Sequence, residues 1–307
     1  MLFNFITPFV MKAKLQHITF TGIDARTNFK ALCEIQREFP FVEFGVLTSY
    51  HWNENGNRYL DPKIIDSLRG HDLNLSLHIC GSAARDAALG KWADIDKLVL
   101  GNLDIFRRIQ INIAERKDCP SFCWIPLYIG QELIIQQRSG DDMSFCEATI
   151  KHWCEREKAE GRDPISVLLD ASGGRGVDTP IKVLHSRGKV GYAGGMNAES
   201  VGGKLSYLLE HKDTGDFWID MESGVRTDDW FDTEKVIKVL WGCIQTIDRL
   251  IRKDIDNPDN FDEFMIDPLT GEEFSSPEEA RKVLENSPFI HDCYDSERLK
   301  HFMKSDF

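Results

Sequence analysis

Short apolar runs alternate with amphipathic stretches from about residue 15 to residue 250. The short runs are typical of β-strands, and the stretches between them repeat apolar residues at helical spacing. The runs predicted to be strands cover residues 15–22, 42–47, 74–80, 108–113, 123–129, 165–170, 189–194 and 216–222. Strands separated by helices are typical of a parallel α/β sheet, and eight is the number that closes a (β/α)8 TIM barrel. The predicted fold class is therefore an α/β barrel of this kind.

Local signals for helix starts support this alternation. Asp24 and Thr27 precede FKALCEIQREF, Asp61 and Pro62 precede KIIDSL, and Asn197 precedes AESVGGKLSYLL. Side chains of Asp, Thr and Asn accept hydrogen bonds from the free N–H groups of a first helical turn, and proline fits the first position of that turn. Helices are therefore expected to follow the first, second and seventh predicted strands.

The character of the sequence changes after Arg252. Residues 253–307 are acidic and rich in turn residues, and they contain one segment with good helix-start signals, SSPEEARKVLEN. We expect these residues to form a C-terminal extension that packs on the outside of the barrel, which itself covers residues 15–252. Residues 1–14 are expected to form an N-terminal extension. A barrel of about 250 residues plus an appendage fits a chain of 307 residues.

Composition narrows the classes of function. The formal net charge of -13 repels polyanions, so no nucleic-acid partner is expected. No apolar run is long enough to span a bilayer, so no membrane partner is expected either. The eight cysteines lack a CxxC pair, which is typical of reduced thiols in a cytoplasmic protein and predicts no metal site. A small anionic ligand is compatible with this net charge. The sequence is also compatible with a homodimer.

Glycine-bearing segments follow the last three predicted strands: LLDASGGRGVD (168–178), YAGGMNAESV (192–201) and DMESGVRTDDW (220–230). Glycine lets the backbone approach a ligand and exposes N–H donors, and in such barrels phosphate lies between the seventh and eighth loops. These segments therefore predict a phosphate site, the alternative being tight turns alone. The residues predicted to bind phosphate are Gly173, Gly174, Gly194, Gly195, Ser223, Gly224 and Arg226.

Polar residues concentrate toward the carboxyl ends of the predicted strands, which border the mouth of such a barrel. They are Glu43, His78, Gln110, Asn112, Asp170, Asp220 and Glu222. A purely structural interior would prefer Val, Ile and Leu at these positions. The concentration indicates a working site, although each residue taken alone fits a plain hydrogen-bonding role equally well.

The order LLDASGGRG, AGGMNAESV, DMESGVR resembles the closing third of phosphoribosylanthranilate isomerases. Weaker matches at TGID (21–24), NRYLDP (57–62) and RIQIN (108–112) extend the resemblance over about residues 15–240. It implies an Amadori rearrangement of a phosphorylated sugar amine, with Asp170 as general acid, Arg58 contacting the substrate, and phosphate held by the late glycine turns. The family's general-base cysteine falls at Thr21, whose hydroxyl ionises far above neutral pH.

A replacement base must come from another residue near the mouth. By position the candidates are Asp24, Glu43, Cys80 and Glu222, and the Cys80 thiol needs only a modest shift of its pKa to act. The predicted catalytic residues are Asp170, Cys80 and Glu222, and the predicted substrate-binding residues are Arg58, Gln110, Asn112, Asp24 and Arg175. The alternatives are a loop-capping role for Asp170, an inert buried thiol at Cys80, and surface salt bridges for Arg175 and Arg226.

The sequence therefore predicts a phosphosugar-binding barrel that acts as an isomerase or lyase on a phosphorylated small molecule. Acid–base chemistry is sufficient for this, so no metal and no organic cofactor is expected. Two alternatives stay open. One is a catalytically silent barrel that binds a phosphorylated metabolite or nucleotide as a sensor or interaction module. The other is a phosphoribosylanthranilate isomerase with a substituted base.

Overall fold

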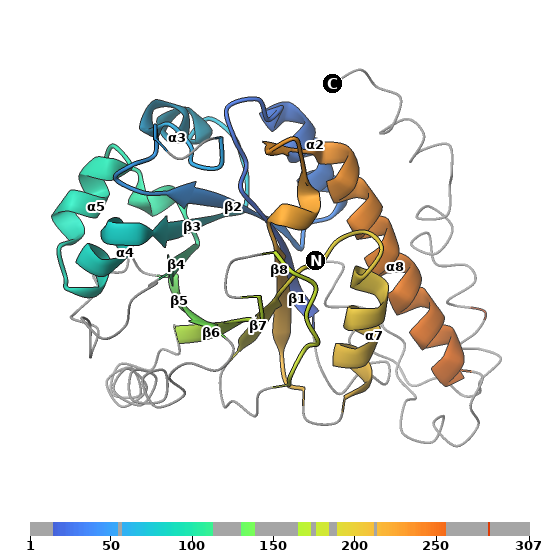
Figure 1. Cartoon of the computed structure of the whole chain (residues 1–307). Helices are drawn as coiled ribbons and strands as arrows, with labels where there is room; N and C mark the ends of the chain where they lie inside the picture. The colour runs from blue at the N-terminus through green and yellow to red at the C-terminus, as the bar shows by residue number, and fades with distance from the viewer. Residues whose placement is uncertain are drawn as a thin grey trace.

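The computed structural model describes residues 15–54, 57–112, 130–138, 165–172, 176–183, 189–211, 214–255 and 282. Parallel strands close into a barrel in sequence order, with β8 pairing back onto β1 (Figure 1). The strands are β1 (Leu15–Thr21), β2 (Val42–Thr48), β3 (Leu75–Cys80), β4 (Arg108–Asn112), β5 (Glu132–Arg138), β6 (Ile165–Asp170), β7 (Val190–Ala193) and β8 (Phe217–Met221). The predicted TIM-barrel fold is confirmed.

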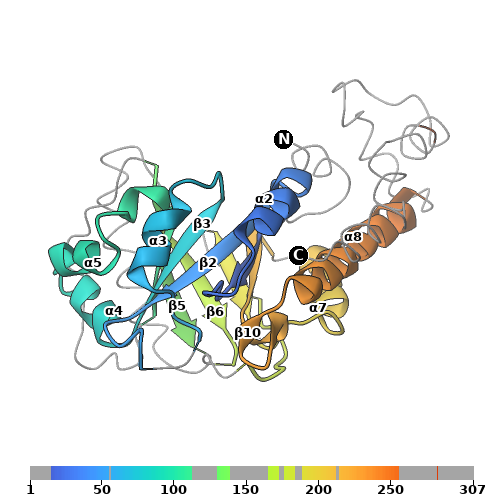
Figure 2. The same cartoon turned by 90° about the horizontal axis from the view of Figure 1, so that it is seen from above.

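Helices connect the strands and surround them. Their bounds are α2 (Phe29–Glu38), α3 (Pro62–Leu68), α4 (Gly81–Ala88), α5 (Trp92–Leu98), α7 (Val201–Glu210) and α8 (Thr233–Ile255), with short 3₁₀ helices at Leu103–Ile105 and Ser223–Val225. After the second of these, β9 (Arg226–Thr227) and β10 (Trp230–Phe231) form a small antiparallel ribbon. Helices α7 and α8 lie side by side in both views (Figure 2). In the part of the chain that the structure describes, no helix is long and apolar enough to cross a membrane.

The helix starts follow the predicted signals at α3 and differ at α2 and α7. The Asp61 carboxylate accepts from Lys63 N (2.8 Å) at the start of α3, with Pro62 at the first position, as expected. Helix α2 is capped by Asn28 instead of Asp24 or Thr27. These two residues bond to each other in the turn that precedes the helix, since Asp24 N donates to Thr27 Oγ1 (2.9 Å). Helix α7 begins at Val201 with Ser200 as its N-cap, and Asn197 instead accepts from Ser200 N (2.8 Å) in the turn before it.

The position predicted for the fifth strand was wrong. The structure places β5 at Glu132–Arg138, between β4 and β6, whereas residues 123–129 lie outside the described residues. Pro126 gives a physical reason, because proline lacks the N–H that a strand with neighbours on both sides needs. The correct segment, ELIIQQR, is polar because the barrel interior is polar at its carboxyl end, where the Gln136 side chain is buried.

The large hydrophobic core lies between the strands and the helices, and a smaller apolar cluster fills the middle of the barrel. Ile134, Leu168 and Trp218 form the smaller cluster. A Cβ on Gly191 would overlap the Trp218 indole ring, so the glycine makes room for it.

The two predicted extensions fall mostly outside the described residues. Residues 1–14 and 256–281 are among those not described, so the packing of the extensions stays a prediction. Helix α8 runs through the boundary predicted at residue 252 and ends at Ile255.

Candidate active site

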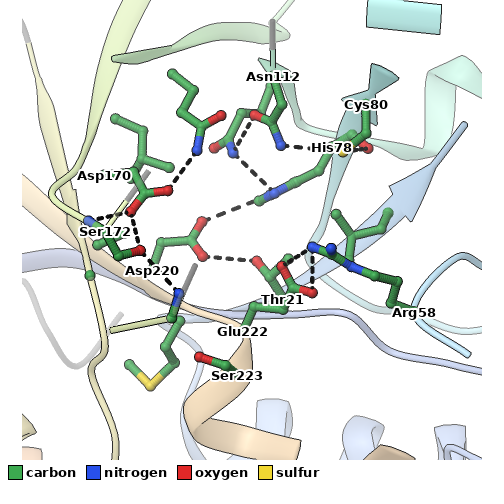
Figure 3. Close-up of a pocket in the computed structure, with 18 of the residues that line it drawn as sticks. Thr21, Arg58, His78, Cys80, Asn112, Asp170, Ser172, Asp220, Glu222 and Ser223 are labelled. Atoms are coloured by element: carbon green, nitrogen blue, oxygen red, sulfur yellow. Dashed lines mark hydrogen bonds and ion pairs between the residues drawn. The ribbon is translucent and has the colours of Figure 1, made fainter. Parts of the chain in front are cut away.

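The carboxyl ends of the strands surround a cavity of about 400 Å³ (Figure 3). Its lining includes Thr21, Arg58, Tyr59, His78, Cys80, Gln110, Asn112, Gln136, Asp170, Ser172, Gly176, Gly194, Gly195, Asp220, Glu222, Ser223, Arg226 and Asp229. The cavity thus brings together ten of the residues predicted from the sequence to be catalytic or ligand-binding: Asp170, Cys80, Glu222, Arg58, Gln110, Asn112, Gly194, Gly195, Ser223 and Arg226.

Asp220, near the end of β8, lies between Thr21 and His78 (Figure 3). Thr21 Oγ1 donates to Asp220 Oδ1 at 2.9 Å, whereas Asp220 Oδ2 is buried without a hydrogen-bond partner. Burial raises the pKa of Asp220 to about 8; the nearby Glu43 also raises it, while the Thr21 hydroxyl and Arg108 lower it. The group is therefore a carboxylic acid at neutral pH that can lose its proton just above it.

His78 on β3 approaches Asp220 from the opposite side of the cavity. Its Nε2 lies 3.9 Å from Asp220 Oδ2 and 3.1 Å from Ser76 Oγ. Gln110 Nε2 donates to Asn112 Oδ1 (2.9 Å) and lies 3.1 Å from His78 Nδ1. Nδ1 then acts as an acceptor, so the ring proton belongs on Nε2, whose hydrogen-bond partner is Ser76 Oγ. Burial lowers the pKa of His78 to about 4, and the ring is neutral.

A second buried carboxylate, Glu43, lies deeper in the barrel and is paired with an arginine. Arg108 Nη1 and Thr19 Oγ1 each donate to Glu43 Oε1 at 3.0 Å. Burial acts to raise the pKa of Glu43, but Arg108 and then His17 outweigh it, so the pKa is lowered. Arg108 also lies over the Trp218 ring, 4.1 Å from its centroid. Glu43 is therefore a structural anion, and it does not line the cavity.

Asp170, the predicted general acid, has both carboxylate oxygens occupied. Gln136 Nε2 donates to Oδ2 (2.8 Å), while the backbone N–H and the hydroxyl of Ser172 donate to Oδ1 (3.0 and 2.8 Å). Ser172 Oγ in turn accepts from Gly176 N (3.2 Å). This is the loop-capping arrangement, and it holds the start of the glycine loop after β6 in place.

Cys80, the predicted thiol base, is buried at the end of β3. Burial raises its pKa to about 11, although hydrogen bonds from Asn112 and Tyr59 to the sulfur act in the opposite direction. Asn112 Nδ2 lies 3.4 Å from the sulfur. Very little thiolate exists at neutral pH under these conditions, so the geometry does not favour this residue as the base.

Arg58 and Glu222 form an ion pair at the rim of the cavity. Arg58 Nη2 lies 2.7 Å from each oxygen of the Glu222 carboxylate. Burial alone would lower the pKa of Arg58, but the Glu222 carboxylate outweighs it, so the pKa is raised. Arg58, predicted to bind substrate, and Glu222, predicted to be catalytic, are thus paired with each other in this structure.

Arg226 and Asp24, which were predicted to contact the ligand, are joined in the wall beside the cavity. Arg226 donates to the carbonyls of Gly22 and Asp229, and its Nη2 lies 3.4 Å from Asp24 Oδ2. Asp24 is fully buried and also accepts from Phe231 N (2.6 Å). Both side chains tie the loop after β1 to the ribbon after β8, and Asp24 does not line the cavity.

The turns after β6, β7 and β8 meet at one side of the cavity. Gly194 (φ 126°) and Gly195 (φ 63°) adopt left-handed conformations that favour glycine. A Cβ on Gly224 would collide with the Met196 carbonyl, and one on Gly176 would collide with the Ser223 side chain. The late turns therefore pack directly against one another, as the phosphate hypothesis requires.

The remaining predicted residues cannot be placed. Gly173, Gly174 and Arg175 lie outside the described residues. Among the residues that the structure describes, no group of three or more His, Cys, Asp or Glu side chains is arranged to hold a metal ion.

In the sequence, Asp220 and His78 stand out only as polar strand-end residues, with no role predicted for either. Alternation along β8 was the available signal, because it places Trp218, Asp220 and Glu222 on one inward face. The sequence does not show which of these carboxylates forms an ion pair or hydrogen bond with another side chain.

No protein-family model and no curated protein matches the chain. Similar solved structures include N-(5′-phosphoribosyl)anthranilate isomerase from Pyrococcus furiosus, with 15% identity and a TM-score of 0.41, covering 75% of this chain and 99% of that one. They also include phosphoribosyl anthranilate isomerase from Thermococcus kodakaraensis, with 13% identity and a TM-score of 0.41, covering 74% and 98%. Any function for this chain must therefore be argued from the cavity itself.

Proposed function

We propose that the protein is an acid–base enzyme, an isomerase or lyase, that acts on a phosphosugar bound in the barrel mouth. One observation carries the proposal: Asp220 is a buried carboxyl group with a pKa raised to about 8 and an unpartnered oxygen, and it lines the cavity. A general acid works best when its pKa lies near the working pH. Asp220 meets this requirement, whereas Asp170 is already occupied by Gln136 and Ser172.

In the proposed reaction, protonated Asp220 donates a proton to a ring oxygen or leaving group of the ligand. The Thr21 hydroxyl, 2.9 Å away, then stabilises the carboxylate that forms, and His78 Nε2 lies 3.9 Å from its other oxygen. Because its pKa is close to neutral, the same carboxylate can take a proton back from a neighbouring carbon or oxygen. Asp220 can thus act first as the general acid and then as the general base. A separate base at position 21, where the resemblance leads one to expect a cysteine, is then not needed.

Lys204 on α7 supports the proposed phosphate binding, because it holds the glycine turn after β7. Its Nζ donates to the Gly194 carbonyl (2.5 Å) and pairs with Asp178 Oδ1 (2.6 Å). In a trans peptide the C=O and N–H point in opposite directions, so the N–H of Gly195 points away from Lys204. Among the hydrogen bonds between described residues, none uses the N–H groups of Gly195, Ser223 or Gly224. These N–H donors fit a phosphate group, and Lys204 holds the peptide that carries one of them.

The proposed catalytic role of Asp220 is tested with the variant Asp220→Asn. Pools of phosphorylated metabolites are incubated with the wild type and the variant, and mass spectrometry follows consumption and product formation. The wild type should convert a compound that Asp220→Asn converts roughly 10²- to 10⁴-fold more slowly, while both bind inorganic phosphate equally. Asp104→Asn, in an exposed ion pair with Arg69, is the matched control. Equal turnover by wild type and Asp220→Asn would remove Asp220 from the mechanism.

The proposed phosphate binding is tested by calorimetry with inorganic phosphate and the variant Lys204→Met. Loss of the lysine should weaken binding about tenfold, because the Gly194–Gly195 peptide loses the charge-assisted hydrogen bond that orients it, worth about 1.5–3 kcal/mol. Lys204→Arg should retain most of the affinity. Lys238→Met, an exposed lysine on α8, should change nothing. Wild-type protein that does not bind phosphate would rule out the phosphate site itself.

A second candidate function is a barrel that binds a phosphorylated ligand without transforming it. The observation in its favour is that Thr21 stands where the resembled family has its base, while Asp170 and Glu222 are both held by other side chains. If the wild type and Asp220→Asn both retain the same unchanged ligand, this function is the correct one.

A further inference from the structure

Two buried side-chain oxygen atoms lie unpartnered among the residues that line the cavity. Gln110 Oε1 has no hydrogen-bond partner, because the amide nitrogen of the same side chain is directed to Asn112 and His78. Asp220 Oδ2 has no partner either. Gln110 and Asp220 are 2% and 5% exposed, so bulk water does not satisfy these atoms freely. An unpaired buried polar atom costs about 1–3 kcal/mol, and a ligand that donates to it removes that cost.

Both arginines of the described lining are already engaged by other groups. Arg58 is held by both oxygens of Glu222, and Arg226 is held by Asp24 and by the Gly22 and Asp229 carbonyls. Arg58 Nε is buried without a hydrogen-bond partner, but both pairs of nitrogens that could bind a ligand carboxylate as a fork include Nη2, which Glu222 already holds.

The charges on the described lining add to this effect. Asp170, Glu222 and Asp229 bring three carboxylates to the cavity, against the two arginines. A ligand carboxylate near Arg58 would have to displace Glu222 and would then lie close to a second negative charge. It would also offer no donor to Gln110 Oε1, because an ionised carboxylate only accepts hydrogen bonds.

We propose that the cavity selects a phosphorylated polyhydroxy compound and rejects a phosphorylated acid, with Glu222 as the residue that excludes the carboxylate and with Gln110 and Asp220 receiving ligand hydroxyls. This inference rests on the phosphate binding proposed above. Hydroxyl groups fit both unpartnered atoms because a hydroxyl donates one hydrogen bond and accepts others. The Arg58–Glu222 pair then closes the rim over the neutral end of the ligand.

The test compares ribose 5-phosphate with 3-phosphoglycerate by calorimetry on the full chain. The wild type should bind ribose 5-phosphate roughly tenfold or more tightly than 3-phosphoglycerate. Glu222→Gln keeps the shape of the side chain but frees the Arg58 fork, so it should bind 3-phosphoglycerate about tenfold better than the wild type does. Adding Arg58→Met to Glu222→Gln should abolish that gain, which identifies Arg58 as the group that Glu222 blocks.

The outcomes distinguish a failure of the selection by Glu222 from a failure of the proposed phosphate binding. If the wild type binds inorganic phosphate and prefers 3-phosphoglycerate, or if Glu222→Gln leaves the ratio unchanged, the selection by Glu222 is wrong and the phosphate site stands. If the wild type binds neither sugar phosphate nor inorganic phosphate, the proposed function fails first. Thermal unfolding of each variant verifies that it is folded, and Glu222 is partly exposed, so the glutamine is expected to be tolerated.

Discussion

Glu43 and Asp220 are two carboxyl groups buried in the same barrel, and they behave in opposite ways. Glu43 contacts the Arg108 guanidinium at 3.0 Å and has a lowered pKa. Asp220 has a neutral hydroxyl and a neutral imidazole as neighbours, and burial raises its pKa to about 8. Burial opposes the charge on both, so the difference lies in whether a cation is in contact. A contacting cation produces a structural anion, and its absence leaves a group that can transfer protons.

The largest expected effect comes from removing the cation beside Glu43. Arg108→Met leaves a buried carboxylate without its counter-charge, which typically costs about 3–5 kcal/mol of folding free energy. Urea unfolding measures the loss. Arg69→Met removes the exposed pair with Asp104 and should cost no more than about 1 kcal/mol. A loss from Arg108→Met as small as that of Arg69→Met would show that Glu43 does not depend on its partner.

The next effect is the pH dependence of stability, where the two carboxyl groups have opposite signs. The folded-state pKa of Asp220 is raised from 3.8 to about 8. Its contribution is therefore fully present below about pH 4, declines as the pH rises toward 8, and is constant above that. Each tenfold difference in proton affinity between folded and unfolded states is worth about 1.4 kcal/mol. Glu43, with a lowered pKa, contributes stability that is lost as the pH falls through its folded value.

Unfolding free energies of the wild type and Asp220→Asn, measured from about pH 5 to about pH 9, isolate the Asp220 part. The stability of the wild type relative to the variant should fall up to about pH 8 and then level off, because the variant has no carboxyl group to ionise. A difference that does not change with pH would mean that the pKa of Asp220 is ordinary.

The smallest effect concerns the hydroxyl that lowers the pKa of Asp220. Thr21→Val removes the 2.9 Å hydrogen bond and should raise the pKa of Asp220 by about one pH unit, since such a bond is worth about 1 kcal/mol. Carbon-13 NMR of labelled aspartate, assigned with Asp220→Asn, follows the titration. A pKa that falls or stays constant would show that Thr21 does not stabilise the carboxylate.

The fold could be predicted from the sequence to a large extent, because alternating strand and helix patterns repeat eight times and leave little choice of architecture. The fifth strand was misplaced because apolar content was given more weight than Pro126, and because ELIIQQR is polar for a reason visible only in three dimensions. Its Gln136 side chain is buried against Asp170 of the next strand.

The site could be predicted only as a set of polar residues at strand ends. Asp170, Asp220 and Glu222 are alike in the sequence, and their roles differ only through partners far away along the chain. Gln136 and Ser172 occupy the first and Arg58 occupies the third, whereas Asp220 retains an unpartnered oxygen. Pairings between residues 34 or 164 positions apart leave no local signal in one sequence.

The most direct test of the account is the protonation state of Asp220 itself. The infrared carbonyl stretch of a protonated carboxyl group, taken as the difference between wild type and Asp220→Asn, reports this state as the pH is raised. We predict that the band is present at neutral pH and is half lost near pH 8. A band that is already absent at about pH 6 would show that Asp220 is ionised like an ordinary aspartate, and the proposed proton donor would not exist.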